Sequence, residues 1–374
     1  MSLVIGIFLV AGSAAATPES RVLWQGPLVA GDGLVWSETN AEAAAVHLWT
    51  ARGERVVYRD NSLAVGRPLA ASGTLLAFER SYPGCPPQPD RVCPQRQDAL
   101  VGPLTGPFRP LVHPRNCVLA TEQTALALDD GIAAYLDVDC ARNRVRVLVR
   151  DVAHSRQARV VRDAPVSSAC CRDVAIAGRY VAWNDDRRTV AVYDRVARRI
   201  AYRASVGPPE GIDVELGFDL QRDGKLAVAY RLVEVARTVP TTIAWYSRAS
   251  PRAHVLPLRG RDTRIRIAGD HIALERSPTV DTSTLVVTDL SGRTRTFTSF
   301  VPPARLRSFD FDGARIAWAA DRVTSTRIDC PPPGQGRPCV RRESGVTTIW
   351  RRALAGRPGV IARLPFVDVV ARGA

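Results

Sequence analysis

An acidic residue recurs shortly after a large apolar residue along this chain of 374 residues. Carboxylate oxygens are the ligands that calcium prefers, so a ring of them can hold a cation or a basic ligand. The alternative, which we favour, is that they pair with neighbouring arginines such as Arg80 and Arg276. The candidate residues for a ligand or cation are Glu38, Glu79, Asp137, Asp185 and Glu275, with Asp321 one step further along its segment.

The cysteines form a second set of residues with chemistry of their own. Eight are present, and an even number in a chain that leaves the cytosol predicts disulfide bonds. Cys85 and Cys93 enclose one short Pro-rich segment, and Cys330 and Cys339 enclose another. We expect a local disulfide in each, worth ~2.5 kcal/mol in the chain-entropy model. A metal shared by these four thiols is the alternative, although zinc sites usually have a closer spacing.

The other four cysteines are Cys117, Cys140, Cys170 and Cys171, and the sequence leaves their pairing open. Two of them, Cys170 and Cys171, are adjacent in the chain. Neighbouring residues of a strand point to opposite faces, so we expect these two to pair with different partners. A vicinal disulfide between them is the less common alternative.

Motifs for catalysis are missing from the sequence. It contains no Gly-x-Ser-x-Gly, no His-Glu-x-x-His and no Gly-rich phosphate-binding loop. The five histidines are scattered along the chain. We therefore assign no catalytic residue, no bound metal and no cofactor, and calcium is the one cation that the scattered carboxylates leave open.

The elements that position these residues belong to a repeat. Seven segments start with a small turn residue, continue as a short apolar run and end on a large side chain. A period of roughly 40–50 residues with only strand-like runs inside it is typical of a β-propeller. We expect the large side chains to pack between neighbouring repeats rather than to stack on a ligand. They are Trp36, Phe78, Tyr135, Trp183, Tyr230, Leu274 and Trp318.

The sixth repeat shows the expected strands most clearly. Residues 263–267 alternate between polar and apolar, and residues 271–275, 285–290 and 294–297 read as three further strands. Four antiparallel strands, repeated seven times, predict an all-β fold: a seven-bladed β-propeller in a single domain, residues 17–374. Closure of the ring has two alternatives, because either residues 21–24 complete the last blade or residues 367–370 complete the first.

The order of the strands distinguishes the two faces of such a disc. Connections from strand two to three, and from strand four to the next strand one, emerge on one side, the looped face. The remaining turns emerge on the other side, the turn face. All eight cysteines and the longest insertions, residues 81–97 and 323–345, belong to the looped face. Long loops on a rigid scaffold often carry binding sites, so we expect a partner there, although protection from proteases also explains the cysteines.

Three segments carry a resemblance to known repeats. They are Asp223-Gly224-Lys225-Leu226-Ala227-Val228-Ala229-Tyr230, Asp312-Gly313-Ala314-Arg315-Ile316-Ala317-Trp318 and residues 285–292, LVVTDLSG. These segments resemble the TolB-type, WD40-like repeats of bacterial exported propellers, although the Ser-Pro that usually precedes Asp-Gly is missing. The resemblance implies the fold. Because TolB-type propellers typically bind proteins, it also implies a protein partner, by analogy of fold alone.

The N-terminal residues predict export. Residues 3–10 are apolar and residues 14–16 are alanines that fit a signal-peptidase site, so residues 1–16 are predicted to be a signal peptide. No basic residue precedes the apolar run, which departs from the usual pattern. The run is too short to cross a bilayer, which takes ~20 apolar residues. We expect a secreted or cell-envelope-associated monomer without a transmembrane segment.

The net charge of +14 is carried almost entirely by arginine, since Lys225 is the only lysine. Such a charge favours an anionic partner. The arginines are scattered rather than grouped, which argues against a nucleic-acid partner. We expect a non-enzymatic propeller that binds a protein or an anionic envelope polymer through its looped face. The alternative is a channel-type enzyme, a hydrolase or lyase, with a cation held by the carboxylates near the channel mouth.

Overall fold

The computed structural model describes residues 22–39, 44–60, 67–83, 95–112, 125–139, 142–154, 157–165, 170–171, 173–207, 214–232, 241–279, 282–330 and 340–371. All regular structure in these ranges is β-strand. Since none of these segments is helical, none forms a helix that could cross a membrane. The prediction of an all-β chain is confirmed for this part of the protein.

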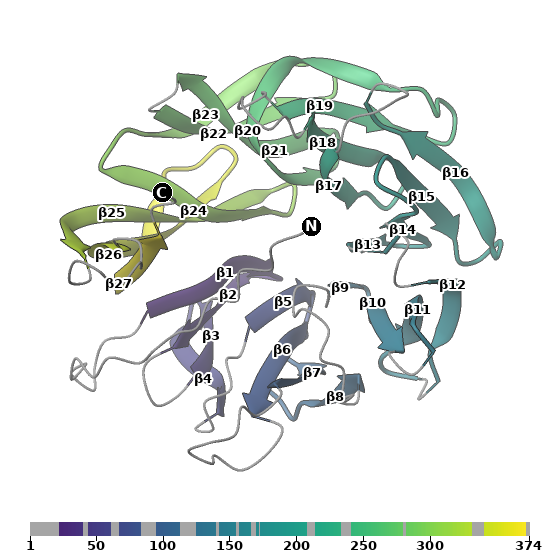
Figure 1. Cartoon of the computed structure of the whole chain (residues 1–374), viewed down its shortest axis with the longest axis horizontal. Coiled ribbons are helices and arrows are strands. Elements are labelled where there is room, and N and C mark those ends of the chain that lie inside the picture. Colours follow the sequence, from purple (N-terminus) through teal and green to yellow (C-terminus); the bar gives the residue numbers. More distant parts are fainter. Residues whose placement is uncertain are drawn as a thin grey trace.

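Consecutive strands pair into antiparallel sheets that surround a common centre (Figure 1). The first sheet contains β1 (Val22–Ala30), β2 (Gly33–Thr39), β3 (Ala44–Thr50) and β4 (Gly53–Asp60). The second contains β5 (Arg67–Ser72), β6 (Leu75–Pro83), β7 (Gln95–Pro103) and β8 (Arg109–Val112). The third contains β9 (Leu126–Asp129), β10 (Ile132–Asp139), β11 (Arg144–Asp151) and β12 (Arg159–Pro165).

Two further sheets also have four strands, and one has seven. The fourth sheet contains β13 (Val174–Ala177), β14 (Tyr180–Asn184), β15 (Thr189–Asp194) and β16 (Arg199–Ser205). The seven-stranded sheet contains β17 (Val214–Leu220), β18 (Leu226–Leu232), β19 (Thr241–Tyr246), β20 (His254–Ala268), β21 (His271–Thr279), β22 (Thr282–Asp289) and β23 (Thr294–Phe300). The last sheet contains β24 (Ala304–Phe311), β25 (Arg315–Asp329), β26 (Val340–Ala353) and β27 (Gly359–Ala371).

The seven-stranded sheet arises because β20 serves two repeats. Its first part pairs with β19, between Thr241↔Gly260 and Trp245↔His254. Its second part pairs with β21, from Ile265↔Leu274 onward. The four-stranded unit predicted for every repeat therefore forms a separate sheet in five cases, while the fifth and sixth repeats are joined. The strands predicted for the sixth repeat are all present.

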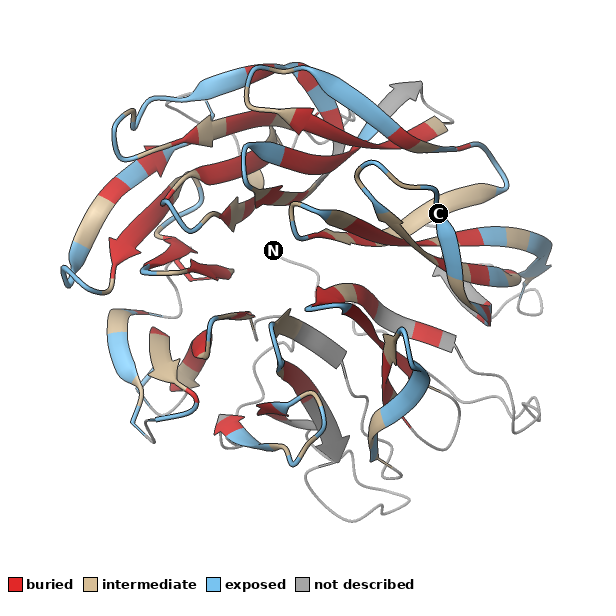
Figure 2. Ribbon diagram, turned by 180° about the vertical axis from the view of Figure 1, so that it is seen from behind, coloured by how far each residue is buried: buried red, intermediate tan, exposed pale blue. Residues whose placement is uncertain are grey.

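Apolar side chains fill the spaces between neighbouring sheets, and the second strand of a repeat is the most deeply buried. Every residue of the second strand β14 is buried, whereas every residue of the fourth strand β4 is exposed or half-buried. Figure 2 shows buried residues concentrated on the inner strands and exposed residues on the outer strands and turns. The predicted packing role is confirmed for six of the seven large side chains, and Tyr230 is partly buried. The six are Trp36, Phe78, Tyr135, Trp183, Leu274 and Trp318.

The first and last sheets meet through side chains rather than through a shared strand. Both proposed closures are wrong, because β1 pairs with β2 in the first sheet and β27 pairs with β26 in the last. An apolar cluster instead joins the two sheets. Hydrogen bonds from Arg307 Nη2 to the Leu23 carbonyl (2.8 Å) and from the Val29 N–H to Asp310 (2.8 Å) cross the same junction. The cluster includes Leu23, Leu34, Trp36, Ala317, Ile349 and Leu364.

The insertion of the last repeat is mostly strand rather than loop. Residues 323–329 of β25 pair with residues 340–345 of β26, and these pair in turn with residues 366–371 of β27. The first strand, β24, ends its pairing at Ala304↔Arg322. Among the described residues, the three extended strands thus form an arm that continues beyond the sheet on the looped face. The expectation of a long loop over residues 323–345 was wrong for this part.

Candidate functional site

A cavity of about 560 Å³ lies on the axis of the molecule. The last residues of the first strand of each repeat line it, from β1, β5, β9, β13, β17, β20 and β24. These residues directly precede the turns between strands one and two, so this axial cavity lies toward the turn face. Its charged lining residues are Asp129, Asp173, Asp219, Arg222, Arg266, Asp310 and Asp312.

Three aspartates of the axial cavity connect one repeat to the next. Each lies on a first strand and accepts a hydrogen bond from a backbone N–H of the following repeat, counting the first repeat as following the last. The bonds are Gly178 N to Asp129 (2.6 Å), Ile267 N to Asp219 (2.8 Å) and Val29 N to Asp310 (2.8 Å). These carboxylates satisfy backbone donors that have no strand partner at the axis, which gives them a structural role.

Arg266 is the cation at the centre of this group. Its Nε lies 2.8 Å from Asp310 Oδ1, and its charge also interacts with Asp219 and Asp173. Burial by itself would lower the pKa of Arg266, but the negative charges of Asp310 and Asp219 outweigh burial and raise the pKa above its usual value. Arg266 therefore stays charged and compensates for several carboxylates at once.

Two carboxylates of the axial cavity ionise near neutral pH. Burial raises the pKa of Asp173 to about 6, against the opposing effects of the Val174 N–H and Arg266. Burial likewise raises the pKa of Asp219 to about 6, although Arg266 and the Ile267 N–H favour its charged form. Both side chains keep partial exposure because they face the cavity. A carboxyl group with a pKa near 6 can give and take a proton at neutral pH.

A second cavity, of about 440 Å³, adjoins the axial cavity and shares Leu28 and Arg266 with it. We call it the arginine cavity, after its charged lining residues Arg264, Arg266, Arg305 and Arg307; Asp321 is the one carboxylate in its wall. Arg305 Nε and Arg307 Nη1 lie 3.4 and 3.2 Å from the same oxygen, Asp321 Oδ2. Thr347 Oγ1 donates to the other oxygen at 2.6 Å.

The five predicted ligand or cation residues line neither of these two cavities. Four of them lie on the second strands of their repeats, and the fifth, Asp185, directly follows the second strand β14. Glu79, Asp137 and Glu275 are buried at these positions. The structure therefore spreads the predicted residues among the sheets. The carboxylates that do converge on the axis are those of the first strands, which the sequence analysis did not single out.

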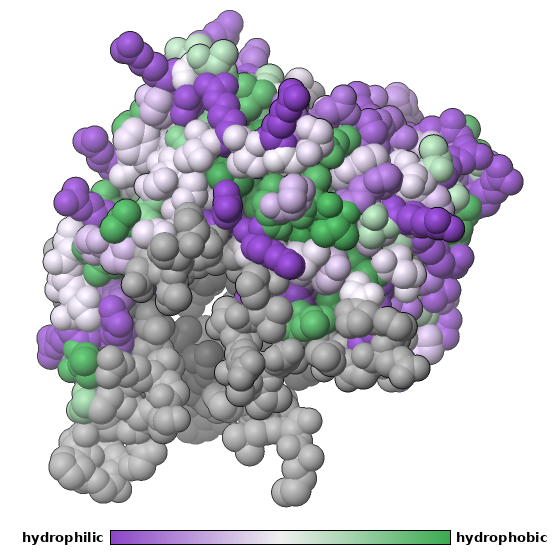
Figure 3. Space-filling view, turned by 90° about the horizontal axis from the view of Figure 1, so that it is seen from above, coloured by the Kyte–Doolittle hydropathy of each residue, from purple (hydrophilic) through white to green (hydrophobic). Residues whose placement is uncertain are grey.

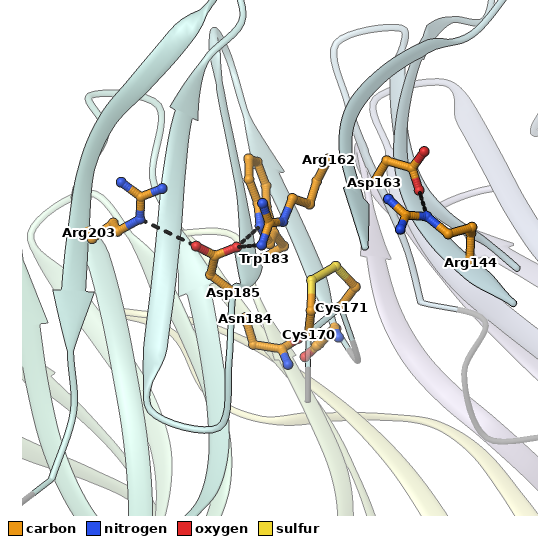
Figure 4. The surroundings of a disulfide bond; sticks show 10 residues. Arg144, Arg162, Asp163, Cys170, Cys171, Trp183, Asn184, Asp185 and Arg203 are labelled. Atoms are coloured by element: carbon orange, nitrogen blue, oxygen red, sulfur yellow. Dashed lines mark hydrogen bonds and ion pairs between the residues drawn. A yellow bond between two sulfur atoms is a disulfide. The ribbon is translucent and has the colours of Figure 1, made fainter. Parts of the chain in front are cut away.

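Asp185 illustrates how such a carboxylate is held. It lies 2.9 Å from Arg162 Nη2 and 3.3 Å from Arg203 Nε, and the Trp183 indole donates to it at 3.4 Å (Figure 4). Arg162 belongs to the preceding sheet and Arg203 to the same sheet as Asp185. The favoured interpretation, pairing with arginine, is confirmed for Asp185. The two arginines that pair with Asp185 lie on fourth strands, β12 and β16, whereas the sequence suggested arginines that directly follow the acidic residue.

Glu38 belongs to a small buried network in the first sheet. The Trp36 indole donates to Glu38 Oε1 at 2.7 Å, and His47 Nε2 lies 3.6 Å from Glu38 Oε2. The other ring nitrogen of His47, Nδ1, lies 2.8 Å from Glu54. Within the described ranges, Glu38, His47 and Glu54 are the one group of carboxylate and imidazole side chains with ligand atoms within 4.8 Å of one another. A carboxylate oxygen thus lies near each ring nitrogen of His47.

The cysteines differ in part from the expectation. Cys170 and Cys171 form a disulfide with each other, so the prediction of different partners is wrong. That prediction assumed an extended strand, but Cys171 has a φ of 65° and β13 begins only at Val174. Cys330 also forms a disulfide. Its expected partner Cys339 lies outside the described residues, as do Cys85, Cys93, Cys117 and Cys140.

Comparison with known proteins gives the fold and nothing finer. No known family model and no curated protein sequence matches the chain. A prolyl endopeptidase structure is 14% identical with a TM-score of 0.54, and the match covers 89% of this chain but only 53% of that one. The propeller domain of the trilobed protease from Pyrococcus furiosus is 9% identical (TM-score 0.49; 80% of this chain, 95% of that one). BamB from Moraxella catarrhalis is 11% identical (TM-score 0.43; 93% and 90%). The chain is thus similar in fold to β-propellers.

Proposed function

We propose that this chain is an exported, non-enzymatic, seven-bladed propeller that binds a protein partner through its looped face. Packing inside the seven-stranded sheet supports the proposed number of blades. Ala227, Ala229 and Ile243 of its first half pack against Ile265 and Leu274 of its second half in one apolar cluster. This packing supports counting the two halves as two blades, with β20 as the last strand of the fifth and the first strand of the sixth.

The one-sided arrangement of connections carries the functional proposal. The turn face has short connections such as residues 31–32, 73–74 and 178–179. The looped face carries the longer connections 84–94 and 113–125 and the arm of β25, β26 and β27. Binding residues concentrate on such segments because the sheets fix their positions while their sequence is free to vary.

The arm gives this face a specific means of binding. Beyond Val323, whose N–H donates to the Pro303 carbonyl at 3.1 Å, no described strand pairs with the edge of β25 on the β24 side, so the N–H and C=O groups of this edge are offered to a partner. Exposed strand edges readily bind an added strand of another chain. Ile328 in this part of β25 is 52% exposed and adds an apolar anchor. A protein partner fits these features better than a polymer without peptide groups, because only peptide N–H and C=O groups can add a strand to this edge.

Secretion, local disulfides and a monomeric state complete the proposal. The TolB-type resemblance of residues 223–230 and 312–318 and the eight cysteines, all in looped-face connections, support it. Hydrophilic side chains are spread over the described surface in Figure 3 rather than gathered in one patch. The arginines are also scattered along the sequence, which supports a protein partner over nucleic acid, with an anionic envelope polymer as the competing ligand.

The test compares partner capture by matched variants of the mature chain from Thr17. One variant replaces residues 84–94 and 330–339 by short Gly-Ser linkers, and the control inserts Gly-Ser residues into the turn-face connections at residues 291–292 and 52–53. We expect a protein captured from the cell envelope by the wild type and the control, and lost with the loop replacements. Equal capture by all three would contradict binding through this face.

A channel-type enzyme is the second candidate, and the axial cavity favours it. Asp173 and Asp219 ionise near neutral pH, as a general acid and base must, and they share one cavity. A cation would then lie among these aspartates, and not at the second-strand carboxylates to which the sequence points. A rise of several degrees in melting temperature with calcium, reversed by a chelator and abolished in Asp173→Asn, would favour this candidate. Glu275→Gln serves as the control, because Glu275 lies outside the cavity.

A further inference from the structure

We propose that Glu38 and His47 of the first sheet bind a divalent transition-metal ion such as zinc, and that Glu54 holds His47 in position. These residues line neither the axial cavity nor the arginine cavity, and the site does not depend on binding through the looped face. An imidazole nitrogen together with carboxylate oxygens is a set of ligand atoms that zinc binds in proteins.

Strand register brings the three side chains to one face of the first sheet. His47 of β3 lies directly opposite Trp36 of β2, and Glu38 follows Trp36 by two residues. Glu54 of β4 lies opposite Trp49, which follows His47 by two residues. Side chains two residues apart point to the same side of a strand. The pairing of the three strands therefore builds the site, although its members are up to 16 residues apart in the chain.

This face of the first sheet is turned toward the last sheet, where burial fixes the two proposed ligands. Trp36 belongs to the same apolar cluster as Ile349 of β26. The side chains of Glu38 and His47 are only 3% and 4% exposed, whereas that of Glu54 is 36% exposed. Buried side chains keep fixed positions, as a set of metal ligands requires. Glu54 lies at the open side of the site, from which an ion can enter.

The distance between the two ligand atoms suits a metal. His47 Nε2 lies 3.6 Å from Glu38 Oε2, which is longer than a hydrogen bond. Two ligand atoms of one tetrahedral zinc ion are roughly 3.3 Å apart, because each bond to zinc is about 2.0–2.1 Å long. A small adjustment of the two side chains therefore places an ion between them.

The groups behind the two ligands orient them as in a metal site. Glu54 Oε1 lies 2.8 Å from His47 Nδ1. A carboxylate accepts this hydrogen bond, so the lone pair of the neutral imidazole is on Nε2, the nitrogen nearer Glu38. The Trp36 indole donates to Glu38 Oε1 at 2.7 Å, and its ring stacks on His47 with centroids 5.4 Å apart. Hydrogen bonds of this kind fix the orientation of metal ligands and raise the basicity of the imidazole.

Calorimetry with zinc chloride on the full mature chain, prepared without a histidine tag, tests the proposal. Thiols are first blocked with iodoacetamide, because thiolates also bind zinc. We expect zinc to bind, and Glu38→Gln and His47→Gln each to weaken it by about tenfold or more. His154→Gln is the matched control. His154 also lies beside a carboxylate, 3.1 Å from Asp151, but it is 84% exposed, and its loss should leave zinc affinity unchanged.

Two substitutions of Glu54 test its positioning role. Glu54→Ala should weaken zinc about tenfold, because His47 loses the group that orients it. Glu54→Gln should retain most of the affinity, because the amide oxygen still accepts a hydrogen bond from His47 Nδ1. Equal losses in the two variants would contradict this role.

Circular dichroism without zinc shows which variants are folded. Glu54→Ala, at the exposed position, keeps the test decisive if the substitutions of buried residues prevent folding. Three results would overturn the metal site: no binding at millimolar zinc, unchanged affinity in folded Glu38→Gln or Glu54→Ala, or a loss as large in His154→Gln. Capture of a partner through the looped face is measured independently, so either proposal can fail while the other stands.

Discussion

Individual aspartates on the first strands bind the next repeat through hydrogen bonds that the sequence does not predict. Asp310 lies between Phe309 and Phe311, and period-two alternation predicts only that it faces away from the apolar side of its strand. The pattern cannot tell whether that side is the outer surface or the axis of a ring. The structure places Asp310 on the axis, 2.8 Å from Arg266, a partner in another repeat. Contacts between residues far apart in the chain leave no local signal.

The raised pKa of Asp219 makes the stability of the protein depend on pH. The pKa of an aspartate side chain is 3.8 when it is fully solvated, as in the unfolded chain, and that of Asp219 is about 6 in the folded protein, because burial disfavours its charged form. The folded state therefore binds this proton more tightly than the unfolded state does. The protonated carboxyl group contributes its full stabilisation below pH 3.8, and this stabilisation is lost as the pH rises through about 6. Asp219→Asn should increase the free energy of unfolding by about 2–3 kcal/mol at neutral to alkaline pH and by little in acid.

Denaturant unfolding at several pH values measures this effect. Asn keeps an oxygen that can accept the Ile267 N–H, so the substitution removes the charge and retains the hydrogen bond. Asp310→Asn is the matched control. It weakens the ion pair with the half-buried Arg266 and should destabilise the protein at neutral pH. A pH-independent loss of stability in Asp219→Asn would contradict the account of this carboxyl group.

At the scale of elements, the sequence predicts what local pattern determines. The segment from Gly178 to Trp183 reads as a turn and an apolar strand, and the structure has that turn and β14, because burial on both sides of a strand requires continuous apolar residues. The joining of two repeats by β20 was not predictable. Residues 259–263 are polar and contain Gly260, which is typical of a turn, yet the chain continues as strand. The vicinal disulfide was missed because a residue with positive φ interrupts the expected extension.

The turn between β17 and β18 gives a prediction at this scale. Gly224 has a φ of 85°, and a Cβ there would lie 3.0 Å from the Tyr180 ring of the preceding repeat. Gly224→Ala therefore combines backbone strain with a clash, and we expect a loss of about 2–3 kcal/mol in the free energy of unfolding. Gly269→Ala is the control, since its φ is 60° but a Cβ would meet nothing within 4 Å. Thermal or denaturant unfolding measures both variants. An equal loss of stability in Gly224→Ala and Gly269→Ala would show that the contact with Tyr180 does not contribute to the effect of the Gly224 substitution.

The whole molecule is a ring whose two ends meet without exchanging a strand. Packing of Leu23 and Trp36 against Ile349 and Leu364 closes it, and polar contacts from β24 to β1 cross the same junction. The arginine cavity lies beside this junction, because β1 and β24 provide two of its walls. The arm on the looped face and the arginine cavity thus both lie at the place where the ring closes. A partner bound there would contact both ends of the chain.

Site-specific photo-crosslinking in the producing cell tests binding by the looped face most directly. The crosslinking residue replaces Ile328 on the arm, or Val196 in the turn between β15 and β16 on the turn face, which are 52% and 65% exposed. Both are large apolar side chains, so the two positions differ mainly in the face that they occupy. We expect one defined protein adduct from position 328 and none from position 196. An adduct from position 196 alone, or equal adducts from both, would contradict the proposed function.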